Sequence, residues 1–282
     1  MLQVMFQAVA EKIWCQEATS AHKKRVAIVG GMHGDEPEGI ALIESLLAKK
    51  ESYWEDAIFD VTLALGNPEA ITSSQRVDRT ETDLNRAFGS ADPTAVHPRA
   101  QLLQEALRDA DIVLDIHQTH LPINACVVCP KTAAHLELAI HLGAQQAVTG
   151  TEKIFGANML SDWANRKGRL GLTFETGQAG TNRALEVAQR AVEQLLFVPI
   201  PPQLPRTDFL IWEVVDVLAA PGENYEFVRP FTNGSRVAEG EVIAVANETH
   251  INALVDGAIF LPRTGQEVGA PCCIQVQATN WP

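Results

Sequence analysis

The chain has 282 residues, of which 46% are hydrophobic and 20% are charged, and its formal net charge is −13. A chain of this length buries enough apolar surface to fold without disulfides, as one large domain or as a large domain with a small one. The acidic charge argues against binding to nucleic acid or to anionic membranes, because both carry the same sign of charge. A pocket for an anionic substrate therefore needs arginines of its own.

The cysteines and the apolar runs indicate a cytoplasmic protein. The cysteine count of five is odd, which disfavours a disulfide framework in a chain of this size. Cys126 and Cys129 stand three apart in an apolar, strand-like run, where such positions point to opposite faces, so we interpret them as core residues. No run approaches 18 apolar residues, and the N-terminal segment lacks the basic start and cleavage site of a signal peptide.

Short β-branched runs alternate with amphipathic segments through the first 198 residues. This alternation predicts an α/β fold in which helices cover both faces of a mixed sheet. Residues 69–95 are polar and show no clear period, as is common in functional or disordered segments. Strands are expected at 25–31, 57–66, 111–118, 124–129 and 170–176, and helices at 36–50, 97–110, 132–143 and 181–197.

The composition and the hydrophobic pattern of the sequence change after residue 198. Residues 199–205 hold four prolines in seven positions, which is typical of a semi-rigid linker. Beyond it, short alternating runs are separated by turn signals such as Asn233-Gly234 and Asp256-Gly257, as in a small all-β domain. We therefore expect a catalytic domain at 1–198, a linker at 199–207 and a β domain at 208–282.

Two histidines and a glutamate follow two of the expected strands in a pattern that suits a divalent metal. His33 and Glu36 stand three apart in the glycine-rich turn GGMHGDE, and His117 ends a later strand. A catalytic zinc takes three protein ligands of this kind, and α/β sheets bind ligands at the C-terminal ends of their strands. Asp115 lies on the same strand face as His117, and His120 is an alternative ligand. We expect His33, Glu36 and His117 to hold one Zn²⁺ ion per chain.

A glutamate within the apolar run GLTFETG is a candidate general base. A carboxylate in an apolar strand is costly to bury unless it is paired or used. Apolar neighbours raise the pKa of such a carboxyl, which would suit Glu175 to accept a proton from water and pass it to a leaving amine. The alternative is a residue of an edge strand that faces solvent.

Arginines cluster in the irregular segment. Arg76 and Arg79 precede the string DLNR, which contains Asn85 and Arg86. A guanidinium binds a carboxylate through two parallel hydrogen bonds, and an asparagine amide adds donors. Three arginines so close together in an acidic protein favour a site for a small anion over a solvated loop.

Five strings occur in a characteristic order: GGMHGDEPEG, GNPEA, DLNRAF, DIHQTH and FETG. This ordered set resembles the aspartoacylase and succinylglutamate desuccinylase family, from about residue 25 to the end of the chain. The resemblance implies a catalytic domain similar to the zinc carboxypeptidases, followed by a small C-terminal β domain. It also implies zinc-dependent hydrolysis of the amide bond of a small, anionic N-acyl amino acid.

The same resemblance implies roles for individual residues. His33, Glu36 and His117 match the zinc ligands of the family, and Glu175 matches its general acid/base.

Three further roles concern the substrate. Asn85 and Arg86 match the pair that grips the carboxylate of the amino acid. Arg76, with Arg79 as the alternative, matches an arginine that polarises the scissile carbonyl. Arg166 matches a further substrate-binding arginine.

Two rival functions and several details stay open at the level of sequence. A metallocarboxypeptidase acting on short peptides would share the zinc site, and a non-catalytic binding protein would share the fold. Aspartoacylases use a tyrosine near the C-terminus, whereas the last tyrosine here is Tyr225, which puts N-acetylaspartate in question as the substrate. The sequence fixes neither the acyl group nor the amino acid, and it leaves a homo-oligomer open.

Overall fold

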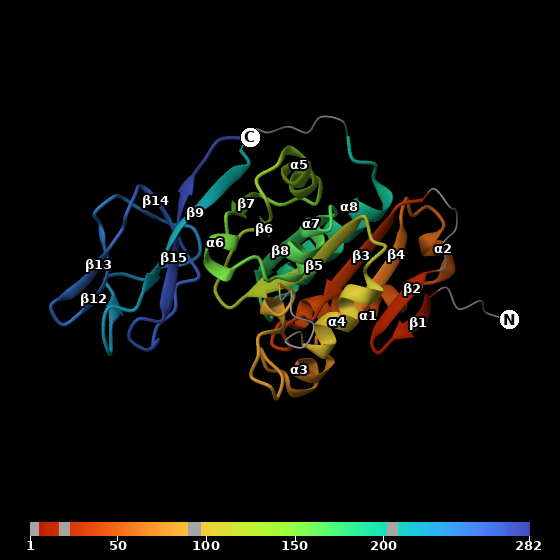
Figure 1. The fold of residues 1–282 in the computed structure, drawn as a ribbon. Coiled ribbons are helices and arrows are strands. Elements are labelled where there is room, and N and C mark those ends of the chain that lie inside the picture. The colour runs from red at the N-terminus through yellow and green to blue at the C-terminus, as the bar shows by residue number, and fades with distance from the viewer. Residues whose placement is uncertain (1–5, 17–22, 90–96, 202–207) are drawn as a thin grey trace.

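The computed structural model describes residues 6–16, 23–89, 97–201 and 208–282 (Figure 1). The strands are β1 (Phe6–Ala10), β2 (Ile13–Gln16), β3 (Arg25–Gly30), β4 (Asp60–Leu65), β5 (Ile112–Thr119), β6 (Cys126–Val128), β7 (Gln146–Thr149), β8 (Leu170–Gln178), β9 (Leu210–Ala219), β10 (Glu226–Phe227), β11 (Ser235–Val237), β12 (Val242–Ala246), β13 (Thr249–Asn252), β14 (Gly257–Phe260) and β15 (Pro271–Ala278).

The helices lie between the strands of the first 197 residues. They are α1 (Pro37–Leu47), α2 (Glu51–Trp54), α3 (Pro68–Ser73), the 3₁₀ turn η1 (Leu84–Arg86), α4 (Pro98–Ala106), α5 (Ala133–His141), α6 (Glu152–Phe155), α7 (Leu160–Arg166) and α8 (Asn182–Phe197). None of the helices in the described ranges is long and apolar enough to cross a membrane.

One mixed sheet of 12 strands runs through the molecule in the order β1-β2-β4-β3-β5-β8-β6-β7-β9-β15-β14-β11. Its centre is parallel, since β4, β3, β5 and β8 pair side by side in the same direction. Strand β6 then pairs antiparallel with β8. The parallel centre places the C-terminal ends of β3, β5 and β8 at one edge, which is where α/β sheets carry their ligands.

Helices cover both faces of this sheet, as the sequence predicted. Successive residues of a strand point to opposite faces, so β3 contributes Val26 and Ile28 to one core and Ala27 and Val29 to the other. The first core receives apolar residues of α1, α5 and α8, and the second receives those of α4 and α7. Burying a strand on both faces explains why these runs read as continuous apolar sequence.

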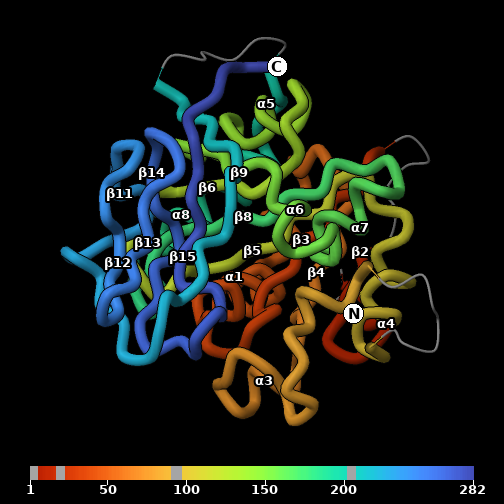
Figure 2. Tube along the Cα trace, turned by 60° about the vertical axis from the view of Figure 1, so that its left-hand side comes forward, coloured from red at the N-terminus to blue at the C-terminus, as the bar shows by residue number. Residues whose placement is uncertain are grey.

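The strands after residue 208 extend the same sheet and add a small one. Strand β9 pairs parallel with β7 and antiparallel with β15, and β10, β12 and β13 form a separate three-stranded sheet. Figures 1 and 2 show this β region in blue, beside β6, β7 and α6. The proposed division into domains at 1–198 and 208–282 stays a prediction, and most of the expected linker 199–207 lies outside the described residues.

The expected elements recur with small shifts at their ends. The polar segment 69–95 contains two short helices, α3 and η1, each begun by a side chain that accepts a backbone hydrogen bond. Asn67 accepts from the Ala70 amide and Asp83 from the Asn85 amide. Strands β1, β2 and β7 and helices α6 and α7 were not expected, because each is too short to show a clear period.

Candidate active site

The turn between β3 and α1 carries the first two candidate ligands. Gly31 has a positive φ of 67°, a conformation that suits glycine, and a Cβ on Gly34 would lie 1.9 Å from the Ala70 carbonyl oxygen. The tight turn therefore depends on residues without side chains. It leaves His33 and Glu36 buried at the edge of the sheet, each only 3% exposed.

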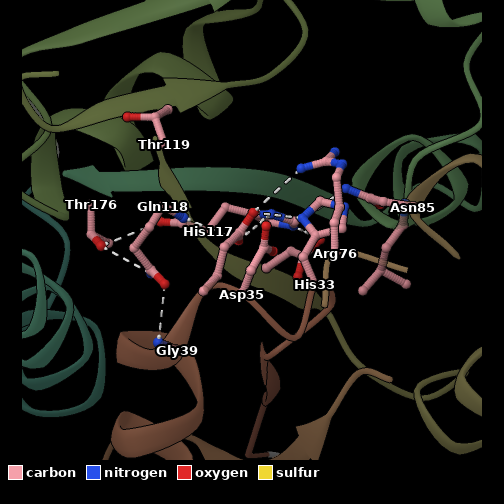
Figure 3. Close-up of polar contacts among 12 residues, drawn as sticks. His33, Asp35, Gly39, Arg76, Asn85, His117, Gln118, Thr119 and Thr176 are labelled. Atoms are coloured by element: carbon pink, nitrogen blue, oxygen red, sulfur yellow. Dashed lines mark hydrogen bonds and ion pairs between the residues drawn. The ribbon is translucent and has the colours of Figure 1, made fainter. Parts of the chain in front are cut away.

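The third candidate ligand comes from the adjacent strand. His117 lies at the C-terminal end of β5, one residue past Ile116, which pairs with Gly30 at the end of β3. One donor atom each from His33, Glu36 and His117 lies within 4.8 Å of the others, and all three residues are buried. Figure 3 shows the two imidazoles converging in the centre of the site. Gln118, the residue after His117, donates its backbone N–H to Glu36 Oε2 at 3.1 Å and so fixes that carboxylate.

The two histidines are held in the same way. The Nδ1 atoms of His33 and His117 lie 2.6 Å and 3.0 Å from the two oxygens of Glu36. Their outer Nε2 atoms contact carboxylates, Asp83 at 3.1 Å for His33 and Asp115 at 2.8 Å for His117. An outer carboxylate fixes the tautomer and orientation of a ligating histidine, and this pairing is typical of metal sites. The donor set and its outer partners therefore fit a divalent metal such as zinc.

The charges of the site favour a bound cation. Burial by itself raises the pKa of Glu36, yet the neighbouring His117 and His33 hold that pKa well below its usual value. Burial lowers the pKa of His117, but Asp115 and Glu36 outweigh it and raise the pKa above its usual value. The same balance, with Glu36 and Asp83 as partners, raises the pKa of His33. A cluster that attracts protons this strongly is also one that attracts a metal ion in their place.

Glu175 lies beside this cluster. It pairs in register with His117 across the parallel strands β5 and β8. Burial raises the pKa of its carboxyl to about 7, while His117 opposes that rise and Glu36 adds to it. Its Oε2 atom is buried and makes no hydrogen bond with a described residue. A carboxylate with one unengaged oxygen and a pKa near neutrality is suited to move a proton.

A cavity opens at this edge of the sheet, and several predicted residues line it. They include the three candidate ligands and Glu175 together with Arg76, Asn85 and Arg86. Arg76 forms ion pairs with Asp83 at 3.0 Å and Glu36 at 3.8 Å, and Figure 3 shows it above His33. Asn85 is buried beside His117, with its amide nitrogen 3.3 Å from the imidazole Nε2.

Two alternative candidates, Arg79 and His120, lie outside the ligand group. The Arg79 side chain is 84% exposed and pairs with Glu69 at 2.9 Å, so the geometry favours Arg76 over Arg79. The His120 side chain is 71% exposed at the rim and lies 3.5 Å from Asp35, outside the ligand group.

The substrate-binding role predicted for Arg166 is not supported by its position. Arg166 is exposed at the end of α7 and is not among the residues that line the cavity. Its guanidinium donates to the backbone carbonyls of Phe88 and Ala157, so it fastens the loops that flank α7. The role of Arg166 that the resemblance implied therefore stays a prediction, and these hydrogen bonds could not be read from the sequence.

Sequence reasoning missed two residues at the site. Asp83 was recognised only as part of the string DLNRAF, yet it contacts His33, Arg76 and the Asn85 amide. Arg263 lines the cavity from the C-terminal β region. No local pattern singles it out, since it stands in the polar turn between β14 and β15.

The model of the succinylglutamate desuccinylase/aspartoacylase catalytic domain matches residues 22–197. The chain belongs to this family. The matched range ends with α8, so it contains all three candidate ligands and Glu175 but not Arg263.

Two relatives have names that specify different substrates. The human N-acyl-aromatic-L-amino acid amidohydrolase (carboxylate-forming) is 32% identical over 133 residues, 42% of this chain and 40% of that protein. The N-alpha-acetyl-L-2,4-diaminobutyric acid deacetylase of Halomonas elongata is 28% identical over 187 residues, 60% of this chain and 53% of that protein. The chain thus matches about half or less of the length of these relatives.

The fold of the family extends through the C-terminal region. The succinylglutamate desuccinylase structure from Chromobacterium violaceum superimposes with a TM-score of 0.78 at 17% identity, covering 98% of this chain and 91% of that one. At this identity the likeness concerns the fold alone. It includes the β region after residue 208, and it confirms the predicted α/β architecture.

Proposed function

We propose that this chain is a zinc-dependent amidohydrolase that removes the acyl group from a small N-acyl amino acid. The observation that carries the proposal is the convergence of His33, Glu36 and His117 within 4.8 Å beside the half-buried Glu175, whose Oε2 atom is buried. Family membership supports it, because the named relatives are an amidohydrolase and a deacetylase of N-acyl amino acids.

In the proposed mechanism, different residues around the scissile amide transfer the proton, stabilise the oxyanion and bind the carboxylate. When bound, a zinc ion lowers the pKa of a water molecule and polarises the acyl carbonyl. Glu175 accepts a proton from the attacking water through its unengaged oxygen and later donates it to the leaving amine. Arg76 faces the site as a donor for the developing oxyanion, and Asn85 and Arg86 bind the carboxylate of the amino acid.

The positions of the outer carboxylates support this division. Asp83 and Asp115 fix the imidazoles of His33 and His117 with Nδ1 directed at Glu36. Both ring orientations are therefore set before any substrate binds, which keeps the geometry of the site constant through the reaction.

A peptide-cleaving carboxypeptidase is the rival with the same donor set. Residues of the C-terminal β region, Phe260 to Arg263, line the cavity together with the catalytic residues. We infer that this lining by the β region leaves less room for a peptide than for a small substrate. The arrangement therefore supports the deacylase over the peptidase.

Metal analysis and a substrate panel test the proposal together. We expect about one zinc per chain, and release of an amino acid from at least one N-acetyl, N-formyl or N-succinyl amino acid that stops on chelation and returns with Zn²⁺. Cleavage of short peptides with unblocked N-termini in preference to every N-acyl amino acid would favour the carboxypeptidase. No bound metal and no hydrolysis of any compound would contradict the proposal.

A further inference from the structure

One side of the cavity is cationic. Three arginines line it, and Arg76 is already paired with Asp83 and Glu36. The guanidinium of Arg86 lies 4.1 Å over the Phe155 ring and donates to a backbone carbonyl.

Arg263 adds a second charge that is not neutralised. Its guanidinium makes no ion pair or hydrogen bond with any residue in the described ranges. Its backbone is held on both sides, since its N–H donates to the Cys272 carbonyl and its carbonyl accepts from the Tyr225 hydroxyl. Burial, and next the charge of Arg76, lowers the pKa of Arg263, although Asp83 opposes this. Burial also lowers the pKa of Arg86, where Asp83 opposes the shift and Arg76 and Arg263 add to it. Arg86 and Arg263 therefore stand near each other, and neither forms an ion pair with a carboxylate of the described residues, in a protein whose net charge is −13.

The cavity also has an apolar wall, which adjoins the arginines where Phe155 lies against Arg86. Its residues belong to one hydrophobic cluster, to which the catalytic region and the C-terminal β region both contribute. Among the described residues that line the cavity, histidines apart, the charged ones are the three arginines, Glu36 and Glu175. The apolar wall consists of Ile123, Val128, Val148, Phe155, Phe260 and Ile274.

We propose that the substrate is an N-acyl amino acid with a single carboxylate, bound jointly by Arg86 and Arg263, and with an apolar group that packs on the apolar wall. The inference rests on the proposed deacylase function and names its substrate class. A second carboxylate directed at the apolar wall would lose its water without gaining a partner, which is strongly unfavourable. An aliphatic or aromatic group at the same place gains from leaving water.

The apolar group could be the amino-acid side chain or the acyl chain, and a substrate panel separates the two. N-Acetylleucine and N-acetylaspartate have side chains of nearly equal size and opposite polarity. N-Hexanoylglycine carries the apolar group on the acyl side instead. We expect kcat/KM for N-acetylleucine or N-hexanoylglycine to exceed that for N-acetylaspartate by at least about tenfold. A preference for N-acetylaspartate over both would overturn this inference and leave the deacylase function intact.

Variants of Arg263 test whether it shares the carboxylate with Arg86. We expect Arg263→Met to raise KM for every member of the panel by about tenfold and to change kcat little, because the lost contact is made before and during the reaction. The control is Arg229→Met, which removes an exposed arginine paired with Glu241 in the same β region. A loss confined to N-acetylaspartate would mean that Arg263 binds a second carboxylate, and this would overturn the proposal.

A cation placed on the apolar wall should change the preference. Val128→Lys should lower kcat/KM for N-acetylleucine and raise it for N-acetylaspartate, whereas Val128→Met should keep the preference for N-acetylleucine. The binding of each compound to the Glu175→Gln variant is measured in parallel by calorimetry, because this measurement does not depend on turnover. If the unaltered chain hydrolyses no compound and the Glu175→Gln variant does not bind N-acetylleucine, both the inference and the proposed function are wrong.

Discussion

His117 on β5 and Glu175 on β8 are paired in register across adjacent parallel strands, so a candidate metal ligand and a candidate base lie side by side at one edge of the sheet. This relationship couples the two roles, because the strand pairing that fixes one side chain also fixes the other. The paired strands are buried at the centre of the sheet, which keeps the distance between them constant.

The first prediction concerns the three candidate ligands. His117→Ala should reduce bound zinc from about one per chain to near zero and abolish hydrolysis, because two protein donors hold a catalytic zinc poorly. Metal analysis of the purified variant, with a thermal melt to verify folding, measures both effects. His120→Ala is the matched control, since its side chain is exposed and lies outside the ligand group. Full zinc content in the His117 variant would contradict the assignment.

The second prediction concerns the outer carboxylates. Asp83→Asn and Asp115→Asn should each weaken zinc binding by about 10- to 100-fold, because each removes the charge that orients an imidazole. Competition with a chelator of known affinity measures the change. Asp109→Asn, at an exposed surface position, should leave zinc affinity as in the unaltered chain. Equal affinities in all three variants would show that the outer contacts play no part in metal binding.

The third prediction is a pH profile. Burial raises the pKa of the Glu175 carboxyl to about 7. A general base must be deprotonated, so kcat/KM should rise with pH and level off above that pKa. A bound cation is an opposite charge that favours the carboxylate and shifts this acidic limb below 7. A rate that falls as the pH rises from 5 to 7 would contradict the role of Glu175 as base.

Glu175→Gln tests the same residue without a change of pH. The amide cannot accept a proton, so kcat should fall by at least about 100-fold while zinc content stays as before. Loss of zinc together with activity would indicate that Glu175 is instead needed to hold the metal.

The fifth prediction distinguishes Arg76 from Arg79. Arg76→Ala should lower kcat/KM by about 100- to 1000-fold, as expected when one donor to a developing oxyanion is removed. Arg79→Ala should change kcat/KM by less than about twofold, because the side chain is exposed and its ion pair with Glu69 is at the surface. Steady-state kinetics measures kcat/KM for both variants. A larger loss in the Arg79 variant than in the Arg76 variant would assign the oxyanion donor to Arg79.

The sequence by itself determined the family, the α/β architecture and the positions of the principal candidate residues. Buried strands such as β3, β5 and β8 are read from their own apolar runs. The turn that carries His33 and Glu36 is likewise marked by its glycines. These features are local, because hydrophobic period and backbone freedom act over a few neighbouring residues.

Only the tertiary structure decided which distant residues meet. Asp83 contacts His33 across 50 residues, and Arg263 reaches the cavity of a site whose candidate ligands all precede residue 118. Arg166 was matched through the family resemblance, yet its guanidinium donates to the carbonyls of Phe88 and Ala157 and does not line the cavity. Such contacts depend on how strands pair and helices pack over long separations, and no short window of sequence contains that information.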